Sequence, residues 1–350
     1  MSSQDLVLLT GATGMVGFRV LMRLLESGYF VRAAVRTQAG FDRIISLPCI
    51  SNYTSQLSSI VVPNITAPFA YYEAVKGAKF VVHVASPCGG APAHLTTQED
   101  LNDHIIQPAV QGTIGLLEAA QWANSVKRVV VTGSLVSIVS QERIMSGALI
   151  DENTLDVDLS MSDGLTRSNA YARSKALAFA AIQAFLRDKK PQFTVVNILP
   201  VFIIGRDEKI TAVKTYYSKG TNSFLMGPLL GIKNHITVMG GNSVHLDDVA
   251  ELHIRGLDEN LATGNETFIA AAGPMTWSDC FDIVQRRFPK ECAEGVFPFD
   301  DILRPSTSAV NVDNAKAKRL LGREFKTYEE QVVSVVEHYL ELRGQRAQNT

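Results

Sequence analysis

The feature that most restricts the fold of this chain is a glycine-rich segment near its start. A short apolar run, residues 6–10, leads into the sequence Gly11-Ala-Thr-Gly-Met-Val-Gly17. Glycines at this spacing permit a tight turn, a close approach of the backbone to a pyrophosphate, and close packing of the next helix on the strand. Residues 15–26 then carry apolar side chains at helical spacing. The segment therefore predicts a strand–loop–helix unit that binds a dinucleotide.

Strand-like and helix-like runs alternate through the first two hundred residues. The strands expected after the first one are residues 30–35, 59–62, 79–84, 127–132 and 193–199. Apolar strands that alternate with helices indicate an α/β fold with a Rossmann-type doubly wound parallel sheet. We expect residues 1–204 to form this NADP-binding Rossmann domain, with residues 243–273 returning to it. Residues 205–242 and 274–350 are expected to form a smaller, mostly α substrate-binding portion.

The charge and the cysteine content argue against several classes of partner. The formal net charge is only −2, so a nucleic-acid or anionic-membrane partner has no electrostatic support. The apolar runs are shorter than the ~20 residues that a membrane helix needs. Cys49, Cys88, Cys280 and Cys292 form no CxxC or Cys/His cluster, which predicts no metal site and a reducing compartment. Residues 1–5 are polar and do not look like a signal peptide, so the expected location is cytoplasmic.

The end of the second expected strand bears on the choice of cofactor. It reads Val35-Arg-Thr-Gln38, with no acidic residue. A site specific for NAD usually has Asp or Glu there, on the ribose 2′-hydroxyl. Arg36 would instead pair with a 2′-phosphate in a charge-assisted contact, and Arg43 is a weaker second candidate. The expected cofactor is therefore NADPH, or NADP+ in the reverse direction.

Three side chains form a candidate catalytic centre. Ser134 follows the fifth expected strand, and Tyr171 and Lys175 are four residues apart, so that they share one face of a helix. We expect Tyr171 to donate a proton to a carbonyl oxygen, because the Lys175 ammonium lowers its pKa from about 10, and Ser134 to hold that oxygen. Tyr72 and Lys76 have the same spacing but lie between the third and fourth strands. We interpret that second pair as structural.

Together these segments resemble those of extended short-chain dehydrogenases/reductases, in the branch that holds dihydroflavonol reductases, cinnamoyl-CoA reductases and yeast-type methylglyoxal or aldehyde reductases. The matching segments span nearly the whole chain: residues 10–17, 31–36, 82–87, 129–134, 171–175, 199–205 and 244–249. The resemblance implies catalysis by Ser134, Tyr171 and Lys175. With the motifs above, it implies a cofactor site made of Gly11, Thr13, Gly14, Met15, Val16, Gly17, Arg36, Asn64, Ile65, Ala85, Ser86, Tyr171, Lys175, Pro200, Phe202 and Ile203.

Within this resemblance, several positions have narrower implied roles. Ala85 and Ser86 would line the cofactor near its ribose, and the backbone of residues 200–203 would hold the carboxamide. The chain departs from the family pattern at Gly133, where many relatives have a serine, and at Asn64-Ile65, where the usual pair is Asp and an apolar residue. Residues 135–139 lack the asparagine that flavonoid reductases use, so a flavonoid substrate is not expected.

The expected activity is NADPH-dependent reduction of an aldehyde or ketone on a small, fairly hydrophobic substrate to the alcohol. Two enzymatic alternatives stay open: an NAD(P)-dependent alcohol or sterol-type dehydrogenase, and a sugar-nucleotide epimerase, which uses the same three residues on the same fold. A non-catalytic NADP-sensing protein is the alternative of another class, although it would not need the triad. Neither a nucleic acid nor a membrane is an expected partner, and the expected state is a monomer or homodimer.

Two acidic residues and a set of apolar residues in the second half of the chain have competing interpretations. Asp247 and Asp248 stand where a helix starts, which favours capping over a metal or acid–base role. A set of apolar side chains fits a wall of the substrate pocket and an ordinary core equally well: Tyr216, Tyr217, Phe224, Leu225 and Met226.

Overall fold

The computed structural model describes residues 5–87, 94–159, 164–218, 220–233 and 238–348, so Cys88 and residues 1–4 lie outside the described part. The chain divides into two compact units. The first unit comprises Met1–Ser140, Thr154–Leu199 and Ala250–Phe268, and the second comprises Gln141–Asn153, Pro200–Val249 and Ile269–Thr350.

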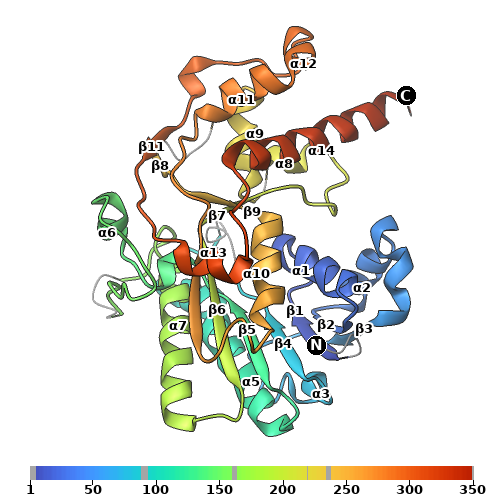
Figure 1. Ribbon diagram of the computed structural model, residues 1–350, viewed down its shortest axis with the longest axis vertical. Helices are drawn as coiled ribbons and strands as arrows, with labels where there is room; N and C mark the ends of the chain where they lie inside the picture. The colour runs from blue at the N-terminus through green and yellow to red at the C-terminus, as the bar shows by residue number, and fades with distance from the viewer. Residues whose placement is uncertain (1–4, 88–93, 160–163, 219, 234–237, 349–350) are drawn as a thin grey trace. The chain divides into compact units, whose positions relative to one another are not determined.

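A seven-stranded sheet forms the centre of the first unit (Figure 1). Its strand order is β10-β6-β5-β4-β1-β2-β3, and the pairings that join β1 to β6 are parallel. The order reverses between β1 and β4, and ligands of such sheets bind at the carboxyl ends of the strands at this point. The strands are β1 (Leu6–Thr10), β2 (Phe30–Val35), β3 (Leu57–Val61), β4 (Phe80–His83), β5 (Arg128–Thr132), β6 (Thr194–Pro200) and β10 (Glu266–Ala270).

The helices of this part of the chain connect successive strands, as the alternating pattern predicts. They are α1 (Met15–Glu26), α2 (Gln38–Ile45), α3 (Tyr72–Val75), α4 (Gln98–Leu101), α5 (Gln107–Ala123), α7 (Ala170–Lys189) and α10 (Leu246–Gly256). Shorter helical turns are η1 (Pro48–Gln56), η2 (Asn102–Ile106) and η3 (Leu135–Ser137). The π-helical turn η2 joins α4 to α5, and Pro108 stands at the start of α5, where its missing N–H costs no hydrogen bond.

One face of the sheet packs against α5 and α7 (Figure 1). Leu8, Val81, Val129 and Val195 are register partners on neighbouring strands, and all four are fully buried in this layer. Burial of each such side chain contributes roughly 1.5–3 kcal/mol. Because side chains two residues apart share a face, the strand ends Thr10 and His83 also point toward this layer.

The opposite face of the sheet contacts other helices. α1 packs on β1 and β2. Farther along, α10 lies close to β5 and β6, since a Cβ added to Gly256 would come within 3.3 Å of Val196 and 3.5 Å of Val130. The doubly wound α/β fold predicted from the sequence is confirmed.

Arg128, the first residue of β5, is a buried charged side chain that is 1% exposed. Its Nε donates to Thr194 Oγ1 at 2.9 Å, and its Nη1 donates to the carbonyl oxygens of Gly256 at 3.2 Å and Asp258 at 3.0 Å. These carbonyls lie at the end of α10, where the helix dipole favours a cation. The guanidinium therefore connects the sheet to Gly256 and Asp258, which lie 128 and 130 positions later in the chain.

The second unit contains two small parallel pairings, β7 with β9 and β8 with β11. Its strands are β7 (Phe202–Ile204), β8 (Val238–Gly240), β9 (Ser243–His245) and β11 (Ser306–Ser308). Its helices are α6 (Gln141–Met145), α8 (Thr215–Ser218), α9 (Asn222–Leu229), α11 (Asp279–Arg287), α12 (Pro289–Ala293), η4 (Asp301–Leu303), α13 (Ala315–Leu321) and α14 (Tyr328–Gln348).

The apolar side chains of residues 216–226 belong to the core of this second unit. Tyr216, Leu225 and Met226 are fully buried in a cluster around Trp277, and Tyr217 and Phe224 pack against its edge. Of the two interpretations that the sequence allows for these five side chains, the structure favours the core.

Asp247 and Asp248 lie in the first turn of α10, as predicted, but their main partners are distant in sequence. The fully buried Asp248 carboxylate accepts hydrogen bonds from Arg323 Nη2 at 2.6 Å and from the Lys326 backbone N–H at 2.8 Å. Asp247 accepts from Lys326 Nζ at 2.7 Å. The two carboxylates therefore fix the position of residues 323–326. This structural role goes beyond the helix capping predicted from the sequence.

Two kinds of feature are absent from the described residues. Among them, no helix combines the length and the apolar character required to cross a membrane. Nor does this part of the chain bring together three or more His, Cys, Asp or Glu side chains in a group that could hold a metal ion.

Candidate active site

The glycine loop lies between β1 and α1, as predicted, and its geometry admits little besides glycine. Gly11 has a φ of +78°, and a Cβ added there would lie 2.7 Å from the backbone nitrogen of Ala85. A Cβ at Gly17 would lie 2.1 Å from the Gly11 carbonyl oxygen. Met15 and Val16 open α1, whose first turn has no acidic residue. The positive end of the helix is therefore available to a pyrophosphate, which fits a dinucleotide cofactor.

Two exposed arginines follow β2, one directly after the strand and one in the last turn of α2. Arg36 directly follows the strand, and Arg43 lies farther along in α2. Thr37 caps α2 by accepting the Gly40 N–H at 3.2 Å. A Cβ added to Gly40 would lie 3.4 Å from Thr13 Cγ2 and 3.9 Å from Arg43 Nη2. The Arg43 guanidinium thus lies beside the glycine loop, and the proximity of Thr37 and Gly40 was not predicted.

The end of β4 lies against the glycine loop. Thr10 Oγ1, at the end of β1, accepts hydrogen bonds from the backbone N–H groups of Val84 at 3.2 Å and Ala85 at 3.1 Å. This contact lies at the reversal of strand order. The predicted cofactor-binding residues Ala85 and Ser86 therefore adjoin Gly11, as a single nucleotide site requires.

Ser134 is held in place by the turn that follows β5. It is the N-cap of η3: its side chain accepts the Ser137 N–H, and Ser137 Oγ accepts the Ser134 N–H at 3.1 Å. Gly133 also has a structural reason, because a Cβ there would come within 2.3 Å of Leu199 Cδ2. A serine at this position would require that leucine to move.

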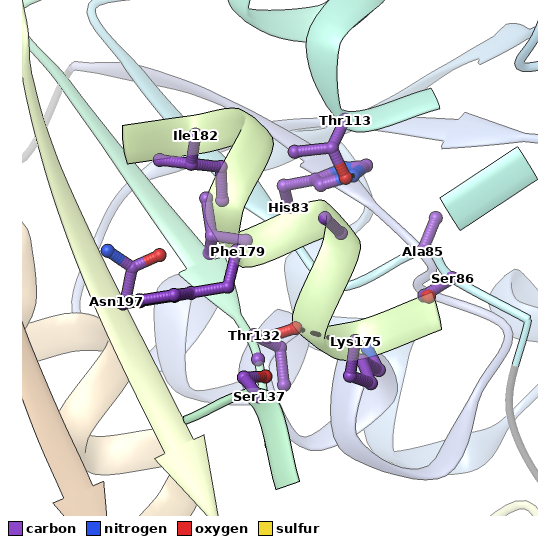
Figure 2. A pocket seen from close by; sticks show the side chains of 13 residues that line it. His83, Ala85, Ser86, Thr113, Thr132, Ser137, Lys175, Phe179, Ile182 and Asn197 are labelled. Atoms are coloured by element: carbon purple, nitrogen blue, oxygen red, sulfur yellow. Dashed lines mark hydrogen bonds between the residues drawn. The ribbon is translucent and has the colours of Figure 1, made fainter. Parts of the chain in front are cut away.

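Tyr171 and Lys175 lie one turn apart at the start of α7, which packs against η3. Lys175 is 7% exposed, and its Nζ donates to the Thr132 carbonyl oxygen at 3.4 Å (Figure 2). The same Nζ lies 5.9 Å from the centroid of the Tyr171 ring. The structure thus brings the helical pair to the end of β5, beside the turn that carries Ser134.

A small cavity of about 20 Å³ adjoins Lys175, enough space for about one water molecule (Figure 2). Its lining joins predicted and unpredicted residues from β4, β5, β6, α5 and α7. The polar members that matter here are His83, Ser86, Thr113, Ser137, Lys175 and Asn197.

His83 and Thr113 are not among the residues predicted from the sequence. His83 Nδ1 is hydrogen-bonded to Thr10 Oγ1 at 2.8 Å, and its Nε2 to Thr113 Oγ1 at 3.2 Å. The signal that identifies His83 is a lone imidazole at the end of an apolar strand, at the edge of the sheet where the nucleotide is expected. Thr113 carries no comparable signal in the sequence.

The second pair with the same spacing, Tyr72 and Lys76, has different surroundings. Lys76 Nζ lies 2.6 Å from Glu73 Oε1 and 5.9 Å from the centroid of the Trp122 ring. Tyr72 stacks on Trp122 with ring centroids 4.9 Å apart. These contacts support the structural interpretation of this pair.

Two predicted cofactor contacts near β3 have local structural roles. Asn64 Oδ1 accepts hydrogen bonds from the Thr66 N–H at 3.0 Å and the Thr66 hydroxyl at 2.7 Å, which forms a turn. Ile65 packs on α5, where a Cβ added to Gly112 would lie 2.8 Å from its Cδ1. A contact of Asn64 or Ile65 with adenine stays a prediction.

The residues predicted to hold the carboxamide lie where β6 ends. Pro200 is the last residue of β6, and Phe202 and Ile203 belong to β7. By the division of the chain, all three fall in the second unit. Their contact with the cofactor stays a prediction.

Comparison with known proteins adds to this geometry. A family model described as "NAD dependent epimerase/dehydratase family" matches residues 7–270. The chain is 32% identical over 358 residues to "Ketoreductase CTB6" of Cercospora nicotianae, which covers 97% of this chain and 96% of that protein. It is 34% identical over 364 residues to "NAD-dependent epimerase/dehydratase FUM13" of Gibberella moniliformis, with 97% and 96% covered.

A solved structure shows the same architecture. Gre2 from Candida albicans, crystallised in complex with NADPH, aligns with a TM-score of 0.82 and 25% sequence identity. The alignment covers 97% of this chain and 99% of that one.

Proposed function

Because the chain belongs to the NAD dependent epimerase/dehydratase family, we propose that it is an oxidoreductase that reduces the carbonyl group of a small, fairly hydrophobic aldehyde or ketone. The ketoreductase relative supports carbonyl reduction as the reaction class. The NADPH bound by the structurally similar Gre2 supports a nicotinamide cofactor. The reverse reaction, oxidation of the alcohol, uses the same groups.

The buried ammonium of Lys175 beside the Tyr171 ring carries this proposal. Lys175 is one helical turn from Tyr171 and lies at the carboxyl edge of the sheet, where its Nζ donates to the backbone carbonyl of Thr132. A cation near a phenol favours the phenolate and lowers the pKa of the hydroxyl. Because reduced solvation strengthens that interaction, a buried lysine acts more strongly than an exposed one.

The roles of the three side chains follow from the chemistry of carbonyl reduction. The nicotinamide cofactor supplies a hydride when it is bound. Tyr171 donates its hydroxyl proton to the carbonyl oxygen, and Lys175 stabilises the phenolate that remains. The Ser134 hydroxyl donates a hydrogen bond to the same oxygen and orients the carbonyl group. Reduction needs the protonated Tyr171, so its rate should fall at alkaline pH, where the hydroxyl ionises.

The preference for NADPH is proposed from the end of β2. Arg36 is exposed there and Arg43 is exposed in α2, so both provide cationic partners for a 2′-phosphate. Residues 35–38 contain no carboxylate that would repel it. Thr13 lies beside Arg43 and belongs to the same corner of the site.

The test is NADPH consumption with a panel of aldehydes, 2-oxo compounds and cyclic ketones. We expect Tyr171→Phe to lower kcat/KM by about 10²- to 10⁴-fold, the usual contribution of a positioned proton donor. Tyr72→Phe is the matched control, since it removes a hydroxyl from the other tyrosine–lysine pair, and should leave the rate within about twofold of the parent. Equal rates for parent and Tyr171→Phe would refute the proposed mechanism.

An epimerase is the second candidate, favoured by the family description and by the name of the Gibberella relative. It differs in its use of the cofactor, which is regenerated within each cycle. Net consumption of NADPH with a carbonyl substrate excludes this candidate as the main activity. Turnover of a sugar nucleotide without net change in the cofactor would favour it.

A further inference from the structure

His83 connects three elements of the first unit at the reversal of strand order. It ends β4, is 3% exposed, and is the register partner of Thr10 at the end of β1. Its Nδ1 is bonded to Thr10 Oγ1 at 2.8 Å and its Nε2 to Thr113 Oγ1 of α5 at 3.2 Å. In Figure 2 the His83 imidazole and the Thr113 side chain lie next to each other, and both line the same cavity as Lys175.

The direction of these hydrogen bonds follows from the partners of the two hydroxyls. Thr10 Oγ1 already accepts two N–H groups, those of Val84 and Ala85, which occupy both lone pairs. Its own proton must therefore go to His83 Nδ1. Thr113 Oγ1 donates to the Ala109 carbonyl oxygen at 2.8 Å, so it accepts a proton from Nε2.

This arrangement fits only one form of the imidazole. With a neutral ring that carries its proton on Nε2, each donor in this hydrogen-bonded chain has an acceptor. The chain runs from the Ala85 N–H through Thr10, His83 and Thr113 to the Ala109 carbonyl oxygen. An imidazolium would direct a second N–H toward Thr10 Oγ1, which has no lone pair left. Burial, and secondly the nearby Lys175 ammonium, lower the pKa of His83 to about 3, in agreement with a neutral ring.

The bonded chain fixes the distance between the two strand ends that flank the nucleotide site. Gly11 follows Thr10, and a Cβ at Gly11 would lie 2.7 Å from the Ala85 nitrogen. The glycine loop and the end of β4 are therefore too close to admit a side chain at Gly11. We infer that neutral His83 is a positioning residue, which holds the glycine loop and Ala85–Ser86 at the spacing that receives the dinucleotide. This inference rests on the proposed function, because it assumes that the crevice binds a nicotinamide cofactor.

Binding of NADPH to the purified full chain, followed by fluorescence titration, tests the role. His83→Leu removes both bonds and should raise the Kd for NADPH about tenfold, while kcat at saturating cofactor changes less than threefold. His83→Asn should restore most of the affinity, because its Oδ1 can accept the Thr10 proton at the position of Nδ1. Thr113→Val, which removes only the other end of the chain, should show an intermediate Kd.

A matched control separates positioning from packing. Tyr71 is 1% exposed and packs edge-on against His83, with ring centroids 6.4 Å apart. Tyr71→Leu disturbs the same core and should lower Tm while the Kd for NADPH stays within twofold. An equal loss of affinity in Tyr71→Leu and His83→Leu, or no rescue by His83→Asn, would overturn the positioning role.

The tautomer gives a readout that does not depend on activity. In ¹⁵N-histidine NMR spectra of the cofactor-free protein, His83 should show a protonated Nε2 and a bare Nδ1 at every pH from 5 to 9. A proton on Nδ1, or titration of His83 within that range, contradicts the bonded chain. If the parent protein binds neither NADPH nor NADH while the tautomer is as expected, the proposed function fails and the positioning role fails with it.

Discussion

The chain contains two tyrosine–lysine pairs of identical spacing, and their surroundings differ in every respect that matters for chemistry. Lys175 is buried at the carboxyl end of a parallel sheet and donates to a backbone carbonyl. The Lys76 side chain is 53% exposed and lies against the Glu73 carboxylate. The helix that carries Tyr171, α7, packs on the turn η3 that Ser134 caps, whereas Tyr72 stacks on Trp122.

This difference shows what the spacing by itself contributes. Four residues on a helix bring a phenol and an ammonium to the same side, but water and a carboxylate cancel most of the field of an exposed cation. The position after the fifth strand buries the Lys175 ammonium beside a small cavity. Position in the fold, rather than the motif, therefore distinguishes the proposed proton-transfer pair from the surface pair.

The largest expected effect tests this contrast directly. Lys175→Met should lower kcat/KM for carbonyl reduction by about 10²- to 10⁴-fold, because the phenolate left after proton transfer loses its cation. Lys76→Met should leave kcat/KM within about twofold, since the exposed ion pair contributes little. Steady-state rates of NADPH oxidation measure both variants. Similar losses in the two variants would remove the distinction drawn from burial.

An exposed cation can contribute to function where it binds a charged ligand. Arg36 is exposed like Lys76, but it is proposed to bind the 2′-phosphate of the cofactor. Arg36→Ala should lower kcat/KM with NADPH roughly 10- to 100-fold, the loss of one charge-assisted phosphate contact, and leave kcat/KM with NADH unchanged. The ratio of the two specificities is the measurement. A parent enzyme that prefers NADH would show that Arg36 is no more functional than Lys76.

Acid should destabilise the buried region through His83. The pKa of His83 is about 3 in the folded chain against an ordinary 6.5, so the unfolded chain binds more protons between these values. Stability from this group is complete above pH 6.5 and is lost as the pH falls toward 3. Between pH 7 and pH 5 the free energy of unfolding should fall by about 2 kcal/mol.

Urea unfolding at the two pH values provides the measurement for the acid effect. His83→Leu should show a pH-dependent loss smaller by that amount. Glu73→Gln, in the exposed pair, should retain the full loss of the parent. An unchanged pH dependence in His83→Leu would argue against a neutral buried imidazole.

The smallest expected effect concerns α5. This helix contributes Thr113 to the cavity beside Lys175 and Trp122 to the surroundings of Tyr72 and Lys76. Gly115 of this helix has open space at its Cβ position, so Gly115→Ala should raise the free energy of unfolding by up to about 1 kcal/mol through helix propensity. Gly112→Ala is the control on the same helix, where the new Cβ would meet Ile65 Cδ1 at 2.8 Å. It should gain less or be destabilised in the same urea titration.

Much of the first unit could be predicted because its signals are local. Strand β2 occupies Phe30–Val35 as expected, since an apolar run is bounded on one side by Gly28 and on the other by Arg36. The glycine loop and the one-turn spacing of Tyr171 and Lys175 also depend on neighbours within a few residues. Strands β7, β8, β9 and β11 have only three residues each, which is too short to leave a periodic pattern.

The parts of the site that sequence reasoning misses depend on contacts between distant residues. The partners of His83 lie 73 and 30 positions away, at Thr10 and Thr113. Nothing in the neighbourhood of a threonine in a helix indicates that its hydroxyl accepts a proton from an imidazole. The same holds for Asp248, whose partner Arg323 is 75 positions away. Composition and periodicity contain no information on such pairs.

The bonds of Arg128 have a consequence for synthesis of the protein on the ribosome. When β1 to β6 have left the exit tunnel, the carbonyl groups of Gly256 and Asp258 have not yet been made. A nascent sheet that closed at that stage would bury a guanidinium without two of its acceptors, which is costly. The first unit should thus stay open, and accessible to chaperones, until residues beyond 258 emerge, although most of its strands are complete about sixty residues earlier.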